Sequence, residues 1–167
     1  MQIQDHNKTS IPLASLFFRA SINSGGQLNE HDAKEVEAIF SELRDAIGDE
    51  FKWEWDGRFN GALTQFDKSN APLILSRLSQ FFMHDWTVTN IENAPEAVLI
   101  AADFLGGLRP GQHLLTTAPD ADPIHVAAFW PWGNGATISV RIIPFGVEIS
   151  PGQMAPFIAD VRTGFNL

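Results

Sequence analysis

Histidines are the residues of this chain whose type could most directly support acid–base or metal chemistry. The five of them never occur as a pair at metal-ligand spacing such as His-x-x-x-His. His113 and His125 fall on adjacent predicted strands, yet no carboxylate is expected in register with either, and two ligands leave a site incomplete. We therefore predict no metal site and no cofactor.

Signatures of nucleophilic or phosphate chemistry are missing from the sequence. The chain has no cysteine and no Gly-x-Ser-x-Gly, and its glycine-rich segment 106–111 lacks a following Lys-Ser or Lys-Thr. Asp120-Ala-Asp122 starts like a calcium loop but lacks the glycine and the terminal glutamate of that loop. These observations favour a protein that is not an enzyme. One alternative stays open: a small hydrolase or transferase that pairs a carboxylate with His113 or His125.

Charge narrows the choice of partners. Eleven lysines and arginines stand against 20 aspartates and glutamates, which gives a formal net charge of −9. Nucleic acids and anionic membranes are bound by basic patches, so neither is an expected partner. No apolar run approaches the roughly 18 residues of a membrane span, and the first residues do not form a signal peptide. We expect a soluble cytoplasmic protein.

Acidic side chains beside aromatic ones are the strongest candidates for a binding surface. The segment 51–56 alternates apolar and charged residues, so Glu54 and Asp56 share a face that is opposite to Trp53 and Trp55. A solvated face is the ordinary explanation of such acids, and an acidic rim near aromatics also suits a basic protein partner.

Two loops add further candidates for the same surface. Asp120 and Asp122 lie in a loop bracketed by two prolines, where solvent exposure is expected. Trp132 follows a proline in the loop 129–135 and could anchor an interface or cap the end of a sheet. The predicted partner-binding residues are therefore Glu54, Asp56, Asp120, Asp122 and Trp132.

These residues are held by an alternation of short elements. Helices are predicted near 30–47, 71–84, 93–105 and 156–162, and strands at 14–22, 51–56, 62–66, 113–117, 124–130 and 136–143. We predict a single α+β domain over residues 1–167, with a mainly antiparallel sheet and helices packed on one face. One core is expected to bury Phe40, Trp53, Trp55, Val126 and Val140.

In size, acidity and lack of a catalytic motif, the chain resembles the immunity proteins of bacterial toxin systems, many of which neutralise basic effector domains. The resemblance rests on composition and length. It implies an inhibitor that covers the active site of a basic toxin or effector domain. A structural or assembly subunit is a further alternative. A large exposed apolar patch would favour it.

Overall fold

The computed structural model describes residues 30–167, and within the first helix it describes side chains from residue 34 onward. The predicted strand 14–22 and the predicted helix cap Asn29 lie outside these residues.

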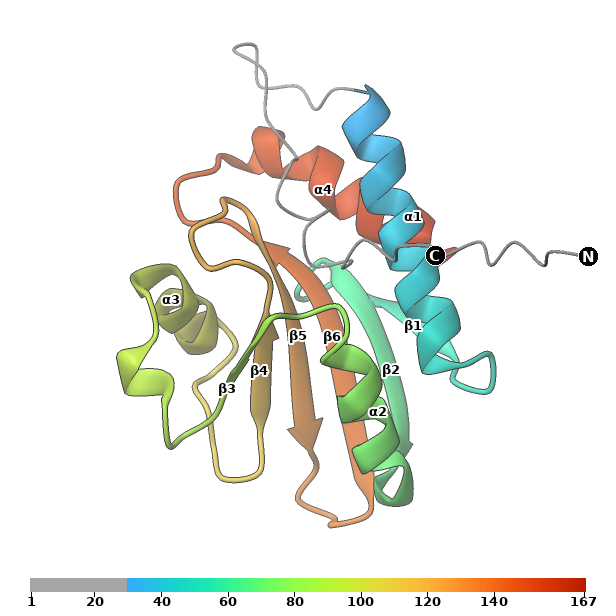
Figure 1. The fold of residues 1–167 in the computed structure, drawn as a ribbon, viewed down its shortest axis with the longest axis vertical. Helices are drawn as coiled ribbons and strands as arrows, with labels where there is room; N and C mark the ends of the chain where they lie inside the picture. Colours follow the sequence, from blue (N-terminus) through green and yellow to red (C-terminus); the bar gives the residue numbers. More distant parts are fainter. Residues whose placement is uncertain (1–29) are drawn as a thin grey trace, which may run out of the picture.

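In the part of the chain that the structure describes, a six-stranded antiparallel sheet forms the centre of the fold (Figure 1). Its strands lie side by side in the order β1-β2-β6-β5-β4-β3, and every neighbouring pair is antiparallel. This confirms the predicted α+β class with its antiparallel sheet. The strands are β1 (Trp53–Asp56), β2 (Gly61–Asp67), β3 (His84–Trp86), β4 (His113–Thr116), β5 (Ile124–Pro131) and β6 (Thr137–Phe145).

Within residues 30–167, four α-helices and two short 3-10 turns accompany the sheet. The helices are α1 (Glu30–Ile47), α2 (Ala71–Leu78), α3 (Glu96–Phe104) and α4 (Pro151–Gly164), and the 3-10 turns are η3 (Lys68–Asn70) and η4 (Ile91–Asn93). Helices α1, α2 and α4 contribute to one core with one face of the sheet. Helix α3 instead packs on the opposite face. The expectation that all helices share one face is therefore wrong for α3.

The alternation of side chains along each strand explains why there are two cores. Phe129 and Val140 point toward α1, α2 and α4, whereas Val126 and Ile143 point toward α3. Val126 thus belongs to the second core, because it is out of phase with Phe129 along β5. Phe40, Trp53 and Val140 are buried in the first core as predicted, and Trp55 packs against it while half-buried.

Three helix boundaries differ from the predicted ones, each for a local reason. Ser150 and Gln153 form a capping box, which starts α4 at Pro151 rather than near 156. Helix α2 ends at Leu78, and a turn then carries the buried Phe81. Helix α3 begins after the extended Pro95, because the predicted cap, Asn93, is part of the turn η4.

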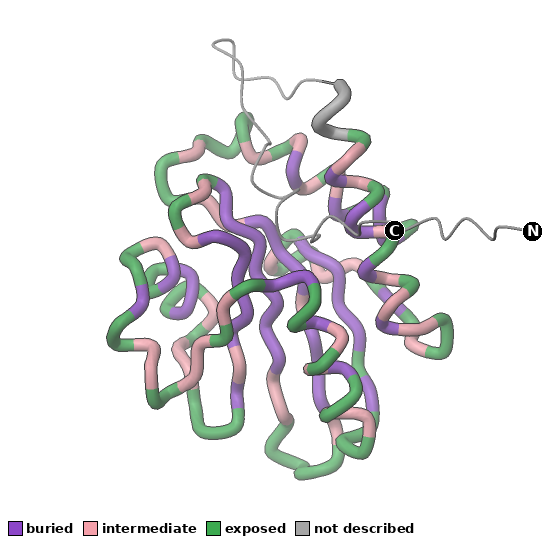
Figure 2. Tube along the Cα trace, in the orientation of Figure 1, coloured by how far each residue is buried: buried purple, intermediate pink, exposed green. Residues whose placement is uncertain are grey.

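The two ends of the sheet carry different loops. The loop from β4 to β5 and the connection from β6 to α4 lie at the upper end in Figure 1, while the hairpin from β5 to β6 lies at the lower end. Figure 2 shows buried strands between these ends and an exposed hairpin at the lower one. At the upper end, Asp120 and Asp122 of the β4–β5 loop line one hollow together with Glu96 of α3.

Candidate functional site

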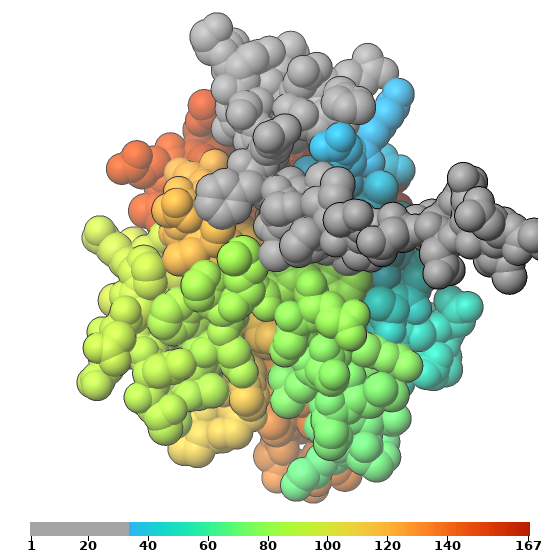
Figure 3. Space-filling model, in the orientation of Figure 1, coloured from blue at the N-terminus to red at the C-terminus, as the bar shows by residue number. Residues whose placement is uncertain are grey.

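Helix α3 carries large apolar side chains on both of its sides. Val98, Ala101 and Ala102 are buried against the sheet. On the outer side, Leu99 is 40%, Ile100 37% and Phe104 52% exposed. Glu96 and Asp103 are also exposed on α3, so its outer side combines these acids with large apolar side chains. Exposed apolar side chains beside charged ones are typical of an interaction surface. In the space-filling view, the yellow-green segment that includes α3 forms a flank of the molecule, set apart from the green α2 (Figure 3).

An acidic hollow of about 220 Å³ opens at the first turn of α3. Its carboxylates come from three segments: Glu96 of α3, Asp120 and Asp122 of the β4–β5 loop, and Glu148 after β6. All four of these residues are exposed, and none forms an ion pair or hydrogen bond with another side chain within residues 30–167. The loop between β4 and β5 is closed by hydrogen bonds between Thr117 and His125. The hollow therefore presents unneutralised negative charge to solvent.

An apolar groove of about 230 Å³ lies at the other end of α3. Phe59, Phe104 and Phe145 form its aromatic wall, with ring centroids 5.7 Å apart for the first pair and 5.5 Å for the second. Met154 and Ile158 of α4 line the opposite side. Phe145 lines both the groove and the acidic hollow. We call the outer side of α3, the groove and the acidic hollow together the α3 surface.

Asp56 borders this surface but is not a free acid. Its Oδ2 accepts a hydrogen bond from Nε of Arg141 at 2.8 Å, and its Oδ1 accepts one from the backbone N–H of Arg58 at 3.1 Å. The guanidinium groups of both arginines lie over the ring of Phe59. Glu54 is exposed on the same sheet face and lines a separate small hollow with Lys52. Both acids lie on the sheet face opposite to Trp53 and Trp55, as predicted, but Asp56 is mostly buried and neutralised by Arg141 instead of facing solvent.

Trp132 lies away from the α3 surface. It is 44% exposed in the β5–β6 hairpin, where its backbone N–H donates to the carbonyl of Thr137. Ile143, which packs against α3, lies in the part of β6 that pairs with the start of β5. It is six residues along β6 from Thr137, so the α3 end and the Trp132 end of this strand are roughly 20 Å apart. The structure thus joins Asp120 and Asp122 to the α3 surface and places Trp132 at the far end. A role for Trp132 as an interface anchor stays a prediction.

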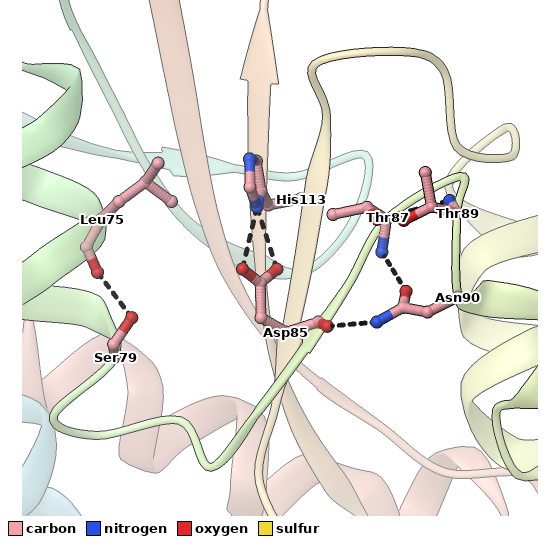
Figure 4. Close-up of polar contacts among 7 residues, drawn as sticks. All are labelled: Leu75, Ser79, Asp85, Thr87, Thr89, Asn90 and His113. Carbon is pink, nitrogen blue, oxygen red and sulfur yellow. Dashed lines mark hydrogen bonds and ion pairs between the residues drawn. The ribbon is translucent and has the colours of Figure 1, made fainter.

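A carboxylate does lie beside one of the candidate histidines, contrary to the expectation from sequence. Nδ1 of His113 lies 2.9 Å and 3.0 Å from the two carboxylate oxygens of Asp85 (Figure 4). Asp85 belongs to β3, a three-residue strand that the sequence did not reveal. Because β3 pairs with β4 so that Asp85 faces Leu115, its side chain shares a sheet face with His113.

This pair has the geometry of a general base with a positioning carboxylate. An Asp that accepts from Nδ1–H leaves Nε2 of the neutral ring as a proton acceptor. Asn90 fixes the backbone on both sides of Trp86, the residue that follows Asp85. Its Nδ2 donates to the Asp85 carbonyl, and its Oδ1 accepts from the N–H of Thr87 (Figure 4). Ser79 does not complete a triad, because its Oγ donates to the carbonyl of Leu75 at 2.8 Å.

His125, the second candidate histidine, is buried, and burial lowers its pKa to about 4. Its ring lies edge-on to Phe40, with centroids 5.2 Å apart. It is therefore neutral at pH 7 and part of the first core. It is not in position to share the carboxylate of Asp85 with His113, because it lies on a different strand, level with Thr117.

Two absences apply to the part of the chain that the structure describes. Across residues 30–167, no group of three or more His, Asp or Glu side chains is arranged to hold a metal ion. Within the same range, no helix combines the length and apolar character that a membrane span needs.

Sequence reasoning missed the outer side of α3 and the pairing of His113 with Asp85. The signal for α3 was present: Val98, Leu99 and Ile100 are consecutive apolar residues, which one buried stripe does not explain.

No family model, curated protein or solved structure matches this chain.

Proposed function

We propose that this protein is a binding protein that inhibits a basic protein partner, in the manner of an immunity protein, through the α3 surface. The observation that supports this most is the exposed Leu99, Ile100 and Phe104 of α3 beside carboxylates that have no counter-ion within residues 30–167. A contiguous apolar patch with a polar rim is typical of protein interfaces. The carboxylates would speed association with a basic partner, and the apolar side chains would set the lifetime of the complex.

Capture of the partner from the native host tests the proposal. The wild-type protein and the variant Ile100→Asp would be used as baits on the same lysate. A charge at Ile100 enters the outer side of α3 without touching the buried residues of that helix. We expect one basic protein to be retained by the wild type and lost by Ile100→Asp.

The matched control is Leu73→Asp. Leu73 is 46% exposed on α2, on the other side of the sheet, so this variant adds the same charge at a similar exposed apolar position. The control should retain the partner, and addition of the wild type should abolish the partner's activity in a purified assay. Equal binding by all three proteins, or a partner whose activity is unaffected, would contradict the proposal.

The Asp85–His113 pair favours a second candidate function, that of a small hydrolase. A base at Nε2 of His113 could activate water for attack on an ester. This candidate is tested by assaying chromogenic carboxylic and phosphoric esters with the wild type, His113→Gln and Asp85→Asn. Activity that both variants lose while keeping the wild-type melting temperature would support it. Activity equal in all three proteins, or none in the wild type, would contradict it.

A further inference from the structure

The apolar groove at the end of α3 is continuous with the acidic hollow through one side chain. Phe145 lines both, and the residues that follow it divide between them: Val147 and Glu148 line the hollow, while Gly146 and Ile149 line the groove. A ligand seated in the groove therefore has the carboxylates of the hollow on one side, whereas the carboxylate of Asp56, near Phe59, is paired with Arg141.

Charge around the groove is distributed unevenly. On the side of Phe145 lie the carboxylates of Glu96, Asp120, Asp122 and Glu148, which have no ion-pair partner in the part of the chain that the structure describes. On the side of Phe59 lies the guanidinium group of Arg58, with its Cζ 4.9 Å from the ring centroid. The second guanidinium there, Arg141, is already paired with Asp56. An occupant with one positive charge is thus attracted toward Phe145 and repelled from Phe59.

From this arrangement we infer that the groove binds a protein segment that carries a large apolar side chain next to an arginine or lysine. The inference rests on the proposed function and specifies the part of the partner that the α3 surface recognises. The apolar side chain fills the space between Phe104, Met154 and Ile158. The cation lies toward Glu148 and Asp120, where the face of Phe145 is also within reach of the same segment.

Short peptides test the inference without knowledge of the partner. The probes are N-acetyl-leucyl-arginine amide and two matched controls, in which citrulline replaces arginine or alanine replaces leucine. Binding is followed by the amide shifts of the ¹⁵N-labelled protein. We expect the leucyl-arginine probe to shift amides at residues 96–97, 120–122 and 145–149, with an affinity at least about fivefold above either control.

Two variants localise the probe to the groove. Met154→Lys and Ile158→Lys each add a cation to its α4 side, and a melting curve shows that each variant is folded. Both should weaken the leucyl-arginine probe by about tenfold or more. Equal affinity for the arginine and citrulline probes, or shifts elsewhere in the protein, would overturn the inference.

The captured partner separates this inference from the proposed function. If the partner binds wild type but not Ile100→Asp, and also loses affinity for folded Met154→Lys and Ile158→Lys, both stand. If it loses affinity only for Ile100→Asp, the groove inference fails and the proposed function stands. If Ile100→Asp binds as tightly as wild type, the proposed function fails.

Discussion

Asp56 and Arg141 link two strands that are not neighbours in the sheet. Nε of Arg141 on β6 lies 2.8 Å from Oδ2 of Asp56 on β1, and β2 runs between the two strands. Both side chains are mostly buried, with 23% of Arg141 and 14% of Asp56 exposed. The ion pair therefore ties the edge strand β1 to the centre of the sheet, and it removes Asp56 from the acids that could steer a partner.

Loss of this ion pair should cost stability. Asp56→Asn keeps the acceptor for the Arg58 N–H but leaves the Arg141 guanidinium without its counter-ion. We expect the free energy of unfolding to fall by about 1–3 kcal/mol, as measured by chemical denaturation. The exposed Glu54 on the same strand is the control: Glu54→Gln should change it by less than about 0.5 kcal/mol. Equal effects of the two variants would show that the ion pair does not brace β1.

A second prediction concerns the contact between α1 and α4. Gly164 at the end of α4 packs against Phe40 of α1, and a Cβ at this position would also lie 3.0 Å from the carbonyl oxygen of Glu37. Its own carbonyl accepts hydrogen bonds from Ser41 and Arg44. Because the backbone of α1 leaves no room, Gly164→Ala should lower the free energy of unfolding by about 1–3 kcal/mol.

Gly152 in the first turn of α4 provides the control for this substitution. Apart from its chain neighbours and the backbone of its own helix, no atom of the described residues lies within 4 Å of a Cβ placed there. Gly152→Ala should be neutral or stabilise the protein by up to about 1 kcal/mol, because alanine favours the helix. A melting temperature that Gly164→Ala leaves unchanged would contradict the close approach of the two helices.

The pH dependence of stability should report on Asp160. Burial, together with the negative charge of Glu37, raises the pKa of Asp160 to about 6, and its Oδ2 has no hydrogen-bond partner among residues 30–167. Since the folded pKa is above the ordinary value of 3.8, the folded state binds the proton more tightly than the unfolded state. This group therefore destabilises the fold progressively as the pH rises from about 4 to about 6, and by a constant amount above that.

Asp160→Asn isolates this effect. The difference in unfolding free energy between variant and wild type should be near zero at pH 4, rise in favour of the variant up to pH 6, and then stay flat. We expect a plateau of about 1 kcal/mol, because water screens this half-buried group. The buried His125 titrates in both proteins, so its contribution to the unfolding free energy cancels in the difference between them. A difference that does not vary with pH would mean that Asp160 is not perturbed in the fold.

Much of the architecture was predictable from the sequence, for reasons tied to particular segments. The alternation of Ile138, Val140 and Ile142 with polar residues marks β6 as a strand with one buried face, and the stripe Val36, Phe40 and Leu43 marks α1. Local patterns of this kind do not state which face of a sheet a helix covers. For this reason the sequence predicts α3 on the same face as the other helices, although its buried side meets Val126 and Ile143.

The candidate site was predictable only in part. The exposure of Asp120 and Asp122 follows from their loop, but their meeting with Glu96 and Glu148 depends on the position of α3 over the sheet. The pairing of Asp85 with His113 depends on β3, which is too short for an alternation pattern to reveal. Contacts between segments far apart in the chain decided both outcomes.

Association kinetics at two salt concentrations test the central claim most directly. The captured partner would be measured against wild type and against a variant with Glu96→Gln, Asp120→Asn, Asp122→Asn and Glu148→Gln combined. If the α3 surface binds a basic partner, wild-type association should slow steeply with salt, and the variant should associate at least about tenfold more slowly at low salt with a much weaker salt dependence. Wild type and variant with the same association rate and the same salt dependence would contradict the account.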